Sequence, residues 1–341
     1  MVHFLPATDV ESLTRQKFPE FGNDPIDLET IDRAGSGRCF YRLCEKDHAD
    51  DGSERRIMAM NYTLDRPENG RFVAITKFLQ SLEIRVPGIR GEDEDQQLLW
   101  VEDLGSQHLS DFSGHDWDYR RLLYQHALMA VAALHQVAEE NAPNELPDME
   151  GGFDEGLYRW EQGYFFDNFV ANFCPGLDGE TADEIRNGTE LRELCEALTR
   201  EPRALIHRDF QSSNVMVQRG RTWLIDYQGM RWGLPEYDIA SLIYDPYVSI
   251  SKAHRDDLAT YYFDLRKTGE SRELFEKRLH RCGAQRLMQA LGAYGNLGLN
   301  MGKSEFLQHI PVAVERLREA AVERGVAPGL QVVLDSVEPN A

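Results

Sequence analysis

The segment I-H-R-D-F-Q-S-S-N occupies residues 206–214, and the tripeptide I-D-Y follows at residues 225–227. Together they supply a carboxylate at Asp209, an amide at Asn214 and a second carboxylate at Asp226. Phosphoryl transfer uses such a set, because one Asp accepts the proton of the attacking hydroxyl while an Asn and another Asp hold Mg²⁺ against the nucleotide phosphates. The spacing matches H-R-D-x-x-x-x-N with an Asp at the later D-F-G position, which predicts a kinase-like catalytic loop.

Two short apolar runs after this loop predict a β-hairpin. Residues 215–217 are apolar, residues 218–221 form a polar turn with a glycine, and residues 223–225 are apolar again. Because the strands of a hairpin run antiparallel, we expect Asn214 and Asp226 to end close enough to share one cation. The alternative is an ordinary surface hairpin in which Asp226 is only a turn residue, but it leaves the upstream spacing unexplained.

The length and charge of the chain narrow the classes of protein it can be. With 341 residues it exceeds one comfortable hydrophobic core, so we expect two packed units. The formal net charge of −21 argues against nucleic acid or an anionic membrane as partner. Small neutral or cationic ligands are easier to accept, although acidity spread along the chain is also typical of a soluble, self-repelling surface.

The cysteines and the N-terminal segment predict a cytoplasmic protein. Five scattered cysteines without a C-x-x-C motif indicate reduced thiols and no zinc site. The first ten residues lack the basic flank of a signal peptide, and no apolar run is long enough to span a bilayer. We expect a monomer or a weak dimer.

Periodicity along the chain changes from short strands to long helices. The first third shows helical spacing at 8–21, with Thr8 or Asp9 as cap, and at 71–83, with strand-like runs at 26–31, 39–43, 57–60, 88–90 and 98–101. Helical spacing then dominates at 118–135, 189–198 and 255–333. We therefore predict an α+β, bilobal, protein-kinase-like fold, with a β-rich nucleotide-binding lobe at 1–104, a helical catalytic and substrate lobe at 105–341, and a hinge at Gly105.

Several longer segments resemble the aminoglycoside phosphotransferase superfamily. They are H-R-D-F-Q-S-S-N at 207–214, I-D-Y-Q-G-M-R-W-G-L-P-E-Y-D-I-A-S-L-I-Y-D-P-Y-V at 225–248, G-S-G-R-C-F-Y-R-L at 35–43, L-L-W-V-E-D-L-G at 98–105 and L-G-A-Y-G-N-L-G-L-N-M-G-K at 291–303. Within the superfamily, the chain looks most similar to the bacterial anomeric kinases of N-acetylmuramate and N-acetylglucosamine. The resemblance covers most of the chain.

The resemblance implies roles for specific residues. Asp209 would be the catalytic base, Asn214 and Asp226 would bind Mg²⁺, and the backbone from Glu102 to Leu104 would receive the adenine of ATP. For His207 and Arg208 we favour a role in bracing the loop over a chemical one. Asp238 begins a helix-like apolar stretch, and N-capping is a sufficient explanation for it.

One position departs from the general kinase pattern. The strand that would carry a phosphate-binding Lys reads I-M-A-M at 57–60, so Met60 stands in the region where that charge is expected. We predict that Arg38 supplies it, directly after Gly35, Ser36 and Gly37, because a guanidinium suits phosphate oxygens. Arg42, on the same strand face, is the second candidate, and Lys77 on the following helix is more typical of a solvated side chain.

The acceptor site is predicted from an aromatic segment with polar residues between its rings. Residues 158–166 place Glu161 among five aromatic side chains. Sugars favour aromatic faces, and carboxylates accept hydrogen bonds from hydroxyl groups. Glu161 is also similar to a Glu of the sugar kinases. The alternative is a helix that packs its aromatics inward and exposes Glu161. Gln211, Gln228 and Arg231 flank the catalytic pieces and are further candidate substrate contacts.

The leading hypothesis is an ATP- and Mg²⁺-dependent kinase of a small sugar, at the anomeric hydroxyl of an N-acetylated amino sugar. One alternative is a kinase of the same fold that acts on an aminoglycoside or an amino alcohol. A second alternative, motivated by the missing Lys, is a non-catalytic nucleotide-binding module.

Overall fold

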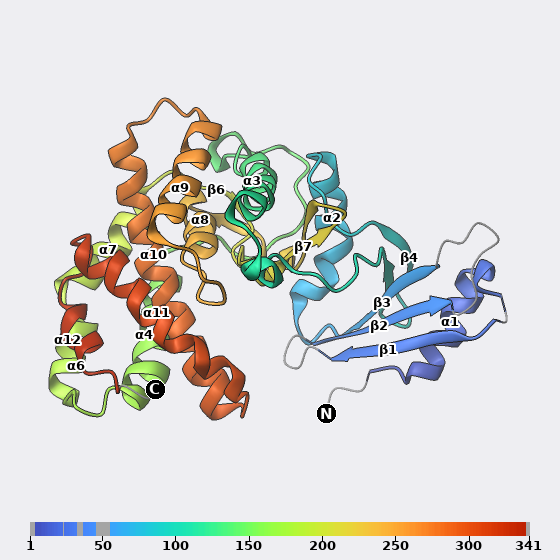
Figure 1. Ribbon diagram of the computed structural model, residues 1–341, viewed down its shortest axis with the longest axis horizontal. Coiled ribbons are helices and arrows are strands. Elements are labelled where there is room, and N and C mark those ends of the chain that lie inside the picture. Colours follow the sequence, from blue (N-terminus) through green and yellow to red (C-terminus); the bar gives the residue numbers. More distant parts are fainter. Residues whose placement is uncertain (1–3, 23, 33–36, 46–54, 339–341) are drawn as a thin grey trace. The chain divides into compact units, whose positions relative to one another are not determined.

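A computed structural model describes residues 4–22, 24–32, 37–45 and 55–338 of the chain (Figure 1). Its contacts divide the chain into two compact units. The first comprises Met1–Gln107, Glu145–Glu150 and Met216–Gly229, and the second comprises His108–Asn144, Gly151–Val215 and Met230–Ala341. The predicted α+β, kinase-like architecture is confirmed, whereas the predicted boundary at residue 104 stays a prediction.

The first unit is built on a five-stranded antiparallel sheet. Its strand order is β1-β2-β3-β5-β4. The strands are β1 (Ile26–Asp32), β2 (Arg38–Glu45), β3 (Arg56–Tyr62), β4 (Ile89–Asp93) and β5 (Leu98–Val101). Leu43, Ala59 and Trp100 are buried on this sheet, because alternate residues of a strand point to the same face. The strands expected from the sequence all form.

Two helices accompany the sheet. Helix α1 (Ala7–Lys17) is anchored where the indole of Trp100 donates a hydrogen bond to Thr14 Oγ1 at 2.8 Å. Helix α2 (Phe72–Ser81) lies where helical spacing was predicted. The predicted cap of α1 is wrong: the N-cap position is Pro6, no side chain caps it, and both Thr8 and Asp9 lie inside the helix.

The predicted hairpin consists of β7 (Val215–Gln218) and β8 (Arg221–Leu224), and most of it belongs to the first unit. Its turn places Arg219 and Gly220 at φ +50° and +71°, the left-handed pair that a tight two-residue hairpin turn requires. Two backbone hydrogen bonds attach the hairpin to the rest of the unit. Val217 N–H donates to the Gln107 carbonyl at 2.9 Å, and Leu224 N–H donates to the Arg85 carbonyl at 2.9 Å.

The second unit is mainly helical. Its helices are α3 (Trp117–Leu134), α4 (Glu155–Phe165), α5 (Ala171–Phe173), α6 (Gly179–Arg186), α7 (Thr189–Arg200), α8 (Pro235–Ile243), α9 (Lys252–Arg266), α10 (Arg272–Gly295), α11 (Ile310–Leu317) and α12 (Leu330–Asp335). A two-stranded sheet pairs β6 (Ala204–Ile206) with β9 (Arg231–Gly233) in antiparallel register. Among the described residues, no helix has the length and apolarity needed to cross a membrane.

Helix α10 packs closely against α4 and against the turn that follows α4, with the glycines of α10 facing backbone carbonyl groups. A Cβ at Gly295 would lie 2.2 Å from the Asn168 carbonyl oxygen, and one at Gly292 would lie 2.8 Å from the Tyr164 carbonyl oxygen. Glycine is therefore required at both positions. Each partner continues into a π-helical turn, η5 (Phe166–Val170) after α4 and η8 (Asn296–Asn300) after α10.

Candidate active site

The predicted catalytic loop leaves β6 and is held by a buried carboxylate of α8. The backbone N–H groups of His207 and Arg208 donate to Asp238 Oδ2 and Oδ1 at 2.7 and 2.8 Å. Asp238 is completely buried, and Arg208 adopts a left-handed φ of +78°. The N-capping explanation for Asp238 is wrong, because the N-cap position of α8 is Leu234 and the carboxylate faces the loop instead.

A histidine of the α3 C-terminus completes this support. His135 Nε2 lies 3.0 Å from Asp238 Oδ2, and its Nδ1 lies 2.6 Å from the hydroxyl of Tyr262. Burial lowers the pKa of His135, although the hydrogen bond to Asp238 opposes that shift. His207 and Arg208 therefore hold the loop through their backbone N–H groups, which donate to Asp238, and His135 in turn orients the Asp238 carboxylate.

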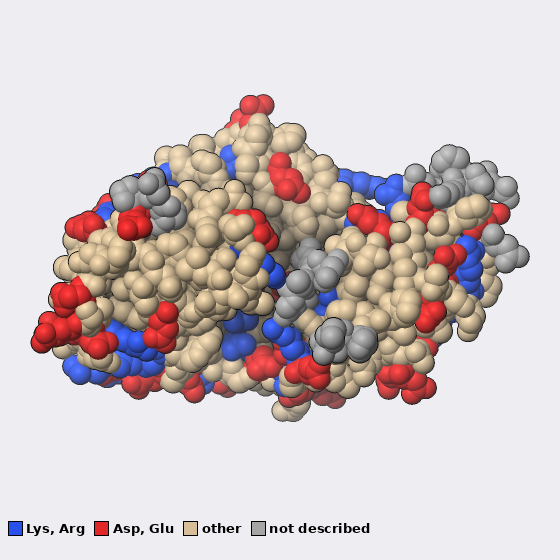
Figure 2. Space-filling model, turned by 90° about the horizontal axis from the view of Figure 1, so that it is seen from below, with Lys and Arg blue, Asp and Glu red and all other residues tan. Residues whose placement is uncertain are grey.

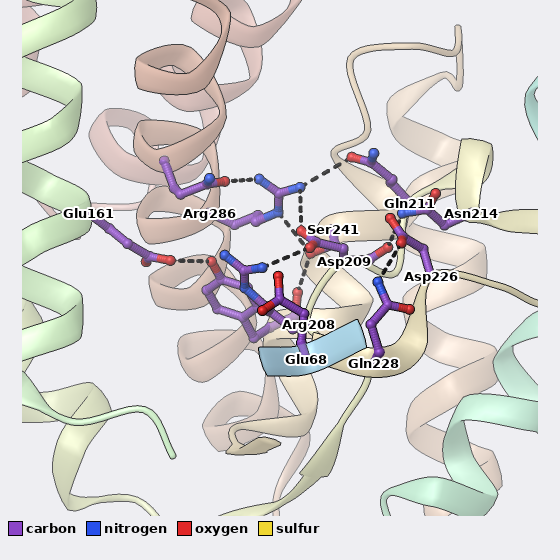
Figure 3. A network of polar contacts seen from close by, with 12 residues as sticks. Glu68, Glu161, Arg208, Asp209, Gln211, Asn214, Asp226, Gln228, Ser241 and Arg286 are labelled. Carbon is purple, nitrogen blue, oxygen red and sulfur yellow. Dashed lines mark hydrogen bonds and ion pairs between the residues drawn. The ribbon is translucent and has the colours of Figure 1, made fainter. Parts of the chain in front are cut away.

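The carboxylate of Asp209 is flanked by two guanidinium groups of the second unit (Figure 3). Arg208 Nη1 donates to Asp209 Oδ2 at 3.1 Å, and Arg286 Nη2 of α10 lies 3.6 Å from Oδ1. Arg286 also donates to Gln211 Oε1 and to Ser241 Oγ, both at 3.2 Å. Burial by itself lowers the pKa of Arg286, but Tyr237 and Asp209 nearby outweigh it and leave that pKa raised.

Asn214 lies in the same loop and closes it. Its Nδ2 donates to the Asp209 carbonyl oxygen at 2.9 Å, and the N–H of Gln211 donates to the same oxygen at 2.9 Å. The short helix η6 (Ser212–Asn214) is fixed by Asp245, which accepts from Ser212 N–H at 2.8 Å. Burial raises the pKa of Asp245. The structure thus brings Asp209, Gln211 and Asn214 together on one rigid loop.

Asp226 belongs to the first unit, two residues beyond β8. It adopts φ +64°, and its Oδ1 accepts a hydrogen bond from Arg38 Nη2 at 2.7 Å. The same oxygen accepts a hydrogen bond from Gln228 Nε2 at 2.8 Å (Figure 3). The next residue, Tyr227, is buried with its hydroxyl 2.7 Å from Thr76 Oγ1 of α2. The predicted metal ligand and the predicted phosphate-binding arginine are therefore in direct contact.

The other candidates for a phosphate-binding cation are placed differently. Arg42 donates to Asp103, to Glu29 Oε2 at 2.9 Å and to the Gly105 carbonyl at 2.8 Å, so its guanidinium is committed to the segment after β5. Lys77 is exposed on α2. Met60 is buried in β3 opposite Phe40 of β2, an apolar site with no place for an unpaired ammonium group.

The glycine-rich turn is described only in part. Gly35 and Ser36 lie outside the described residues. Gly37 has φ +67°, and its carbonyl accepts hydrogen bonds from Thr63 N–H at 2.9 Å and Asn69 Nδ2 at 3.3 Å. The end of the turn that precedes Arg38 is therefore fixed to the chain that follows β3.

The predicted adenine-binding segment follows β5. Glu102 pairs with Gly88 in both directions, donating its N–H to the Gly88 carbonyl at 2.8 Å and accepting the Gly88 N–H on Oε2 at 3.2 Å. Leu104 is buried. Between them, Asp103 accepts the Gly105 N–H at 2.9 Å and pairs with Arg42, which the sequence did not indicate.

Glu161 lies in the interior of the second unit, so the alternative that exposed it is wrong. It is 1 % exposed, and it accepts hydrogen bonds from the Tyr237 hydroxyl and from Gln285 Nε2, both at 3.0 Å. Burial raises its pKa, against the opposing effect of the Gln285 hydrogen bond. Arg231 opens β9 and lies 5.5 Å from the centre of the Phe153 ring. Their substrate roles stay predictions.

The donor set suits a hard divalent cation. Mg²⁺ prefers oxygen ligands and is usually held by one or two protein groups together with water and substrate phosphates. Because Asn214 spends its Nδ2 on the Asp209 carbonyl, its amide oxygen is oriented away from that bond, and Asp226 supplies a carboxylate. Within the described part of the chain, no cluster of three or more His, Cys, Asp or Glu side chains forms a complete metal site. Each of these two residues, taken by itself, offers an oxygen ligand of the kind that Mg²⁺ prefers.

A model of the phosphotransferase enzyme family (APH) matches residues 49–274, about two thirds of the chain. The chain belongs to this family. The predicted superfamily and enzyme class are thereby confirmed: the protein is a phosphotransferase, a kinase with a hydroxyl acceptor.

Curated relatives of this phosphotransferase carry one name. An N-acetylmuramate/N-acetylglucosamine kinase of Pseudomonas aeruginosa is 25% identical over 300 residues, covering 85% of this chain and 84% of its own. Its counterpart of the same name from Pseudomonas putida is 27% identical over 250 residues, covering 72% and 71%.

Solved structures share the fold of the phosphotransferase at low identity. A choline/ethanolamine kinase family protein from Mesorhizobium loti superposes with a TM-score of 0.61 at 15% identity, covering 97% of this chain and 99% of its own. The aminoglycoside phosphotransferase APH(2'')-Ib gives 0.58 at 11%, covering 93% and 99%. These likenesses establish the kinase-like fold.

Sequence reasoning missed the residues that support the loop from elsewhere in the second unit. They are His135, Ser241, Asp245 and Arg286. A signal existed for Asp245 alone, since a carboxylate inside the apolar segment L-I-Y-D-P-Y-V indicates a buried polar group that must find donors.

Proposed function

We propose that this phosphotransferase moves the γ-phosphoryl group of ATP, with Mg²⁺, to the anomeric hydroxyl of an N-acetylated amino sugar such as N-acetylmuramate or N-acetylglucosamine. Two relatives of that name, each matched over more than two thirds of its length, support the acceptor. The observation that carries the chemistry is the loop in which Asn214 and Gln211 both donate to the Asp209 carbonyl, which fixes the predicted base.

The reaction needs little from the protein beyond positioning and charge. The acceptor hydroxyl oxygen bonds to the γ-phosphorus, the bond from that phosphorus to the bridging oxygen breaks, ADP leaves, and the hydroxyl proton goes to Asp209. Arg208 and Arg286 orient this carboxylate, because each lies within 3.6 Å of one of its oxygens. Asn214 and Asp226 would hold Mg²⁺, which supplies neutralisation of the phosphate charge.

Arg38 takes the place of the absent strand lysine in this proposal. Arg38 is 8 % exposed and follows Gly37 directly, and its guanidinium contacts Asp226. A nucleotide that brings Mg²⁺ to Asp226 releases Arg38 from that carboxylate and leaves its donors for phosphate oxygens. The contact between Arg38 and Asp226 also argues against the non-catalytic alternative, because it keeps a cation beside the metal ligand.

The surroundings of Asp209 favour a neutral or anionic acceptor over a cationic one. Arg208 and Arg286 flank the base, while the carboxylate of Glu161 is buried and accepts hydrogen bonds from Tyr237 and Gln285. An aminoglycoside or amino alcohol would bring its ammonium group toward two guanidinium groups, which costs free energy in a partly buried site. The sugar kinase thus stays ahead of these alternatives.

The test is product identification by phosphorus NMR after incubation with ATP, Mg²⁺ and a panel of N-acetylated amino sugars, aminoglycosides and amino alcohols. We expect an anomeric phosphate, and Asp209→Ala should lower kcat by several orders of magnitude while the affinity for nucleotide stays within a few-fold. Phosphorylation of another hydroxyl, or of a cationic acceptor alone, would overturn the acceptor. Nucleotide binding without turnover on any acceptor would support the non-catalytic alternative.

A further inference from the structure

A cavity of about 380 Å³ lies in the second unit, apart from the catalytic loop. Its lining comes from the end of α3, where His135 lies, and the segment after it, from the segment before β6, the start of α8, the end of α9 with the segment after it, and the first half of α10. Arg203 and Ala204 line it where β6 begins, whereas Asp209 follows the far end of that strand. The volume is in the range of small-molecule sites, about 300–1,000 Å³.

The three arginines of the cavity differ in how their charge is balanced. Arg203 makes a bidentate pair with Glu139 at 2.6 and 2.9 Å, and Arg278 pairs with Glu236 at 2.9 Å and with Glu270. Arg266 pairs with no carboxylate among the described residues. Its Nη1 donates to the Tyr262 hydroxyl at 2.9 Å, and its buried Nε has no acceptor in the described part of the chain.

A guanidinium without a carboxylate partner at the wall of a cavity favours an anion, because charge-assisted bonds to carboxylate or phosphate satisfy its donors. The carboxylates that line the same cavity are engaged elsewhere or face solvent. Glu236 and Glu270 both pair with Arg278, which also pairs with Glu201 at 3.5 Å, and Glu140 is exposed at the surface, so none of them is paired with Arg266.

The wall beside Arg266 is aromatic. Tyr262 and Phe275 are both buried, and Phe263 packs against Phe275 with ring centres 5.3 Å apart. The guanidinium of Arg266 lies 5.9 Å from the centre of the Tyr262 ring. The ligand that fits these surfaces therefore combines an anionic group with a flat or apolar body.

The same residues connect the cavity to the catalytic loop. The Tyr262 hydroxyl accepts a hydrogen bond from Arg266 and is also hydrogen-bonded to His135 Nδ1. The other ring nitrogen of His135 is hydrogen-bonded to the carboxylate of Asp238. That carboxylate accepts hydrogen bonds from the backbone N–H groups of His207 and Arg208. A ligand that draws Arg266 away from the hydroxyl changes the first bond of this chain. The bonds from Tyr262 to His135, from His135 to Asp238 and from Asp238 to the His207 N–H are buried, so a change at one end is transmitted along them with little screening by water.

We propose that this cavity is an effector site for a small organic anion with a flat apolar body, held by Arg266, and that its occupancy is transmitted through Tyr262, His135 and Asp238 to the catalytic loop. The binding does not depend on the function proposed above, whereas the effect on turnover rests on it.

Binding is tested on the full chain by isothermal titration calorimetry with phenyl phosphate and benzoate, which separate a phosphate from a carboxylate ligand, and with phenol as the neutral control. We expect one anion to bind and phenol not to bind. Arg266→Gln should weaken binding by about tenfold or more, and Lys267→Gln, an adjacent exposed cation that does not line the cavity, should not. Equal affinities in Arg266→Gln and the unchanged chain would overturn the site.

Hydrogen exchange on the unchanged chain gives a second measurement that needs no variant. A bound probe should slow exchange in peptides covering residues 262–278, and protection elsewhere alone would place the probe at another site and overturn the proposal. This readout decides the question even if Arg266→Gln folds poorly.

The coupling is tested with Tyr262→Phe, which keeps the aromatic wall and removes the hydroxyl that joins Arg266 to His135. We expect the probe to bind with affinity within about threefold of the unchanged chain but to lose its effect on kcat and on hydrogen exchange at residues 204–210. An unchanged response in Tyr262→Phe, or no response in the unchanged chain at saturation, would overturn the coupling. The exchange readout applies even if no acceptor is turned over, so failure of the proposed function remains distinguishable.

Discussion

Replacing Asp238 with Asn tests the contact that holds the catalytic loop. In the unchanged chain Oδ1 accepts from Arg208 N–H, and Oδ2 accepts from His207 N–H and contacts His135 Nε2. An amide presents one oxygen and one NH₂ to the same three groups. His135 can change tautomer to accept from the new NH₂, but a backbone N–H cannot.

Whichever way the amide sits, one backbone N–H of the loop loses its acceptor. Because Asp238 is completely buried, no water replaces it, and a buried unpaired donor costs about 1–3 kcal/mol. That cost falls on the attachment of the loop. The exchange protection of its amides should therefore drop by about 5- to 150-fold.

The assay is hydrogen exchange followed by mass spectrometry on peptides covering residues 204–210, with kcat measured alongside. We expect faster exchange and a lower kcat, because Asp209 is no longer held in one position. The matched control is Asp257→Asn, which removes a carboxylate paired with Arg121 on the surface and should leave these peptides unchanged. Unaltered exchange in a folded Asp238→Asn protein would refute the reasoning.

Three further outcomes are expected. Arg38→Ala should raise the KM for nucleotide and lower kcat, while Arg90→Ala at an exposed position of β4 should not; kinetics equal to the unchanged chain would show that another group binds the phosphates. Glu161→Gln should stabilise the protein at neutral pH and make its stability depend less on pH. Because burial raises the pKa of Glu161, the folded chain keeps the carboxyl proton to higher pH than the unfolded chain, so the free energy of unfolding falls as the pH rises from the unfolded pKa through the folded one. Urea unfolding midpoints measured from pH 4 to 8 in both proteins test this. Cys195 and Cys174, whose pKa values burial raises to about 12 and about 11, should resist iodoacetamide at pH 8 until urea unfolds the chain, and rapid native labelling of either would contradict their burial.

The fold was largely predictable because its signals are local. Each expected strand of the first third forms, since a short apolar or alternating run bounded by turn residues indicates a strand, as the alternating β1 and the fully apolar β5 both show. The cap of α1 was mispredicted because Thr8 and Asp9 are good capping residues in general, whereas this helix begins at Ala7, before either of them, and no side chain caps it.

The candidate site was predictable only where one loop contains it. Asp209 and Asn214 are five positions apart, so a motif finds them. Arg286 reaches the same carboxylate from α10, and His135 reaches Asp238 from α3, and no local pattern connects residues so distant in sequence. Asp238 is an example. Its neighbours in the sequence suggest a helix cap, whereas its hydrogen bonds to the His207 and Arg208 N–H groups show that it anchors the loop.

The path of the backbone through the two units has a consequence for biosynthesis and for dissection. Residues 216–229 are made after nearly half of the second unit, yet their hairpin is hydrogen-bonded to Arg85 and Gln107. An amino-terminal fragment that stops at 107 would leave those carbonyls without their donors. Neither unit is a continuous stretch of chain, so neither can be completed on the ribosome before residue 229 has emerged, and no single protease cut releases one of them whole.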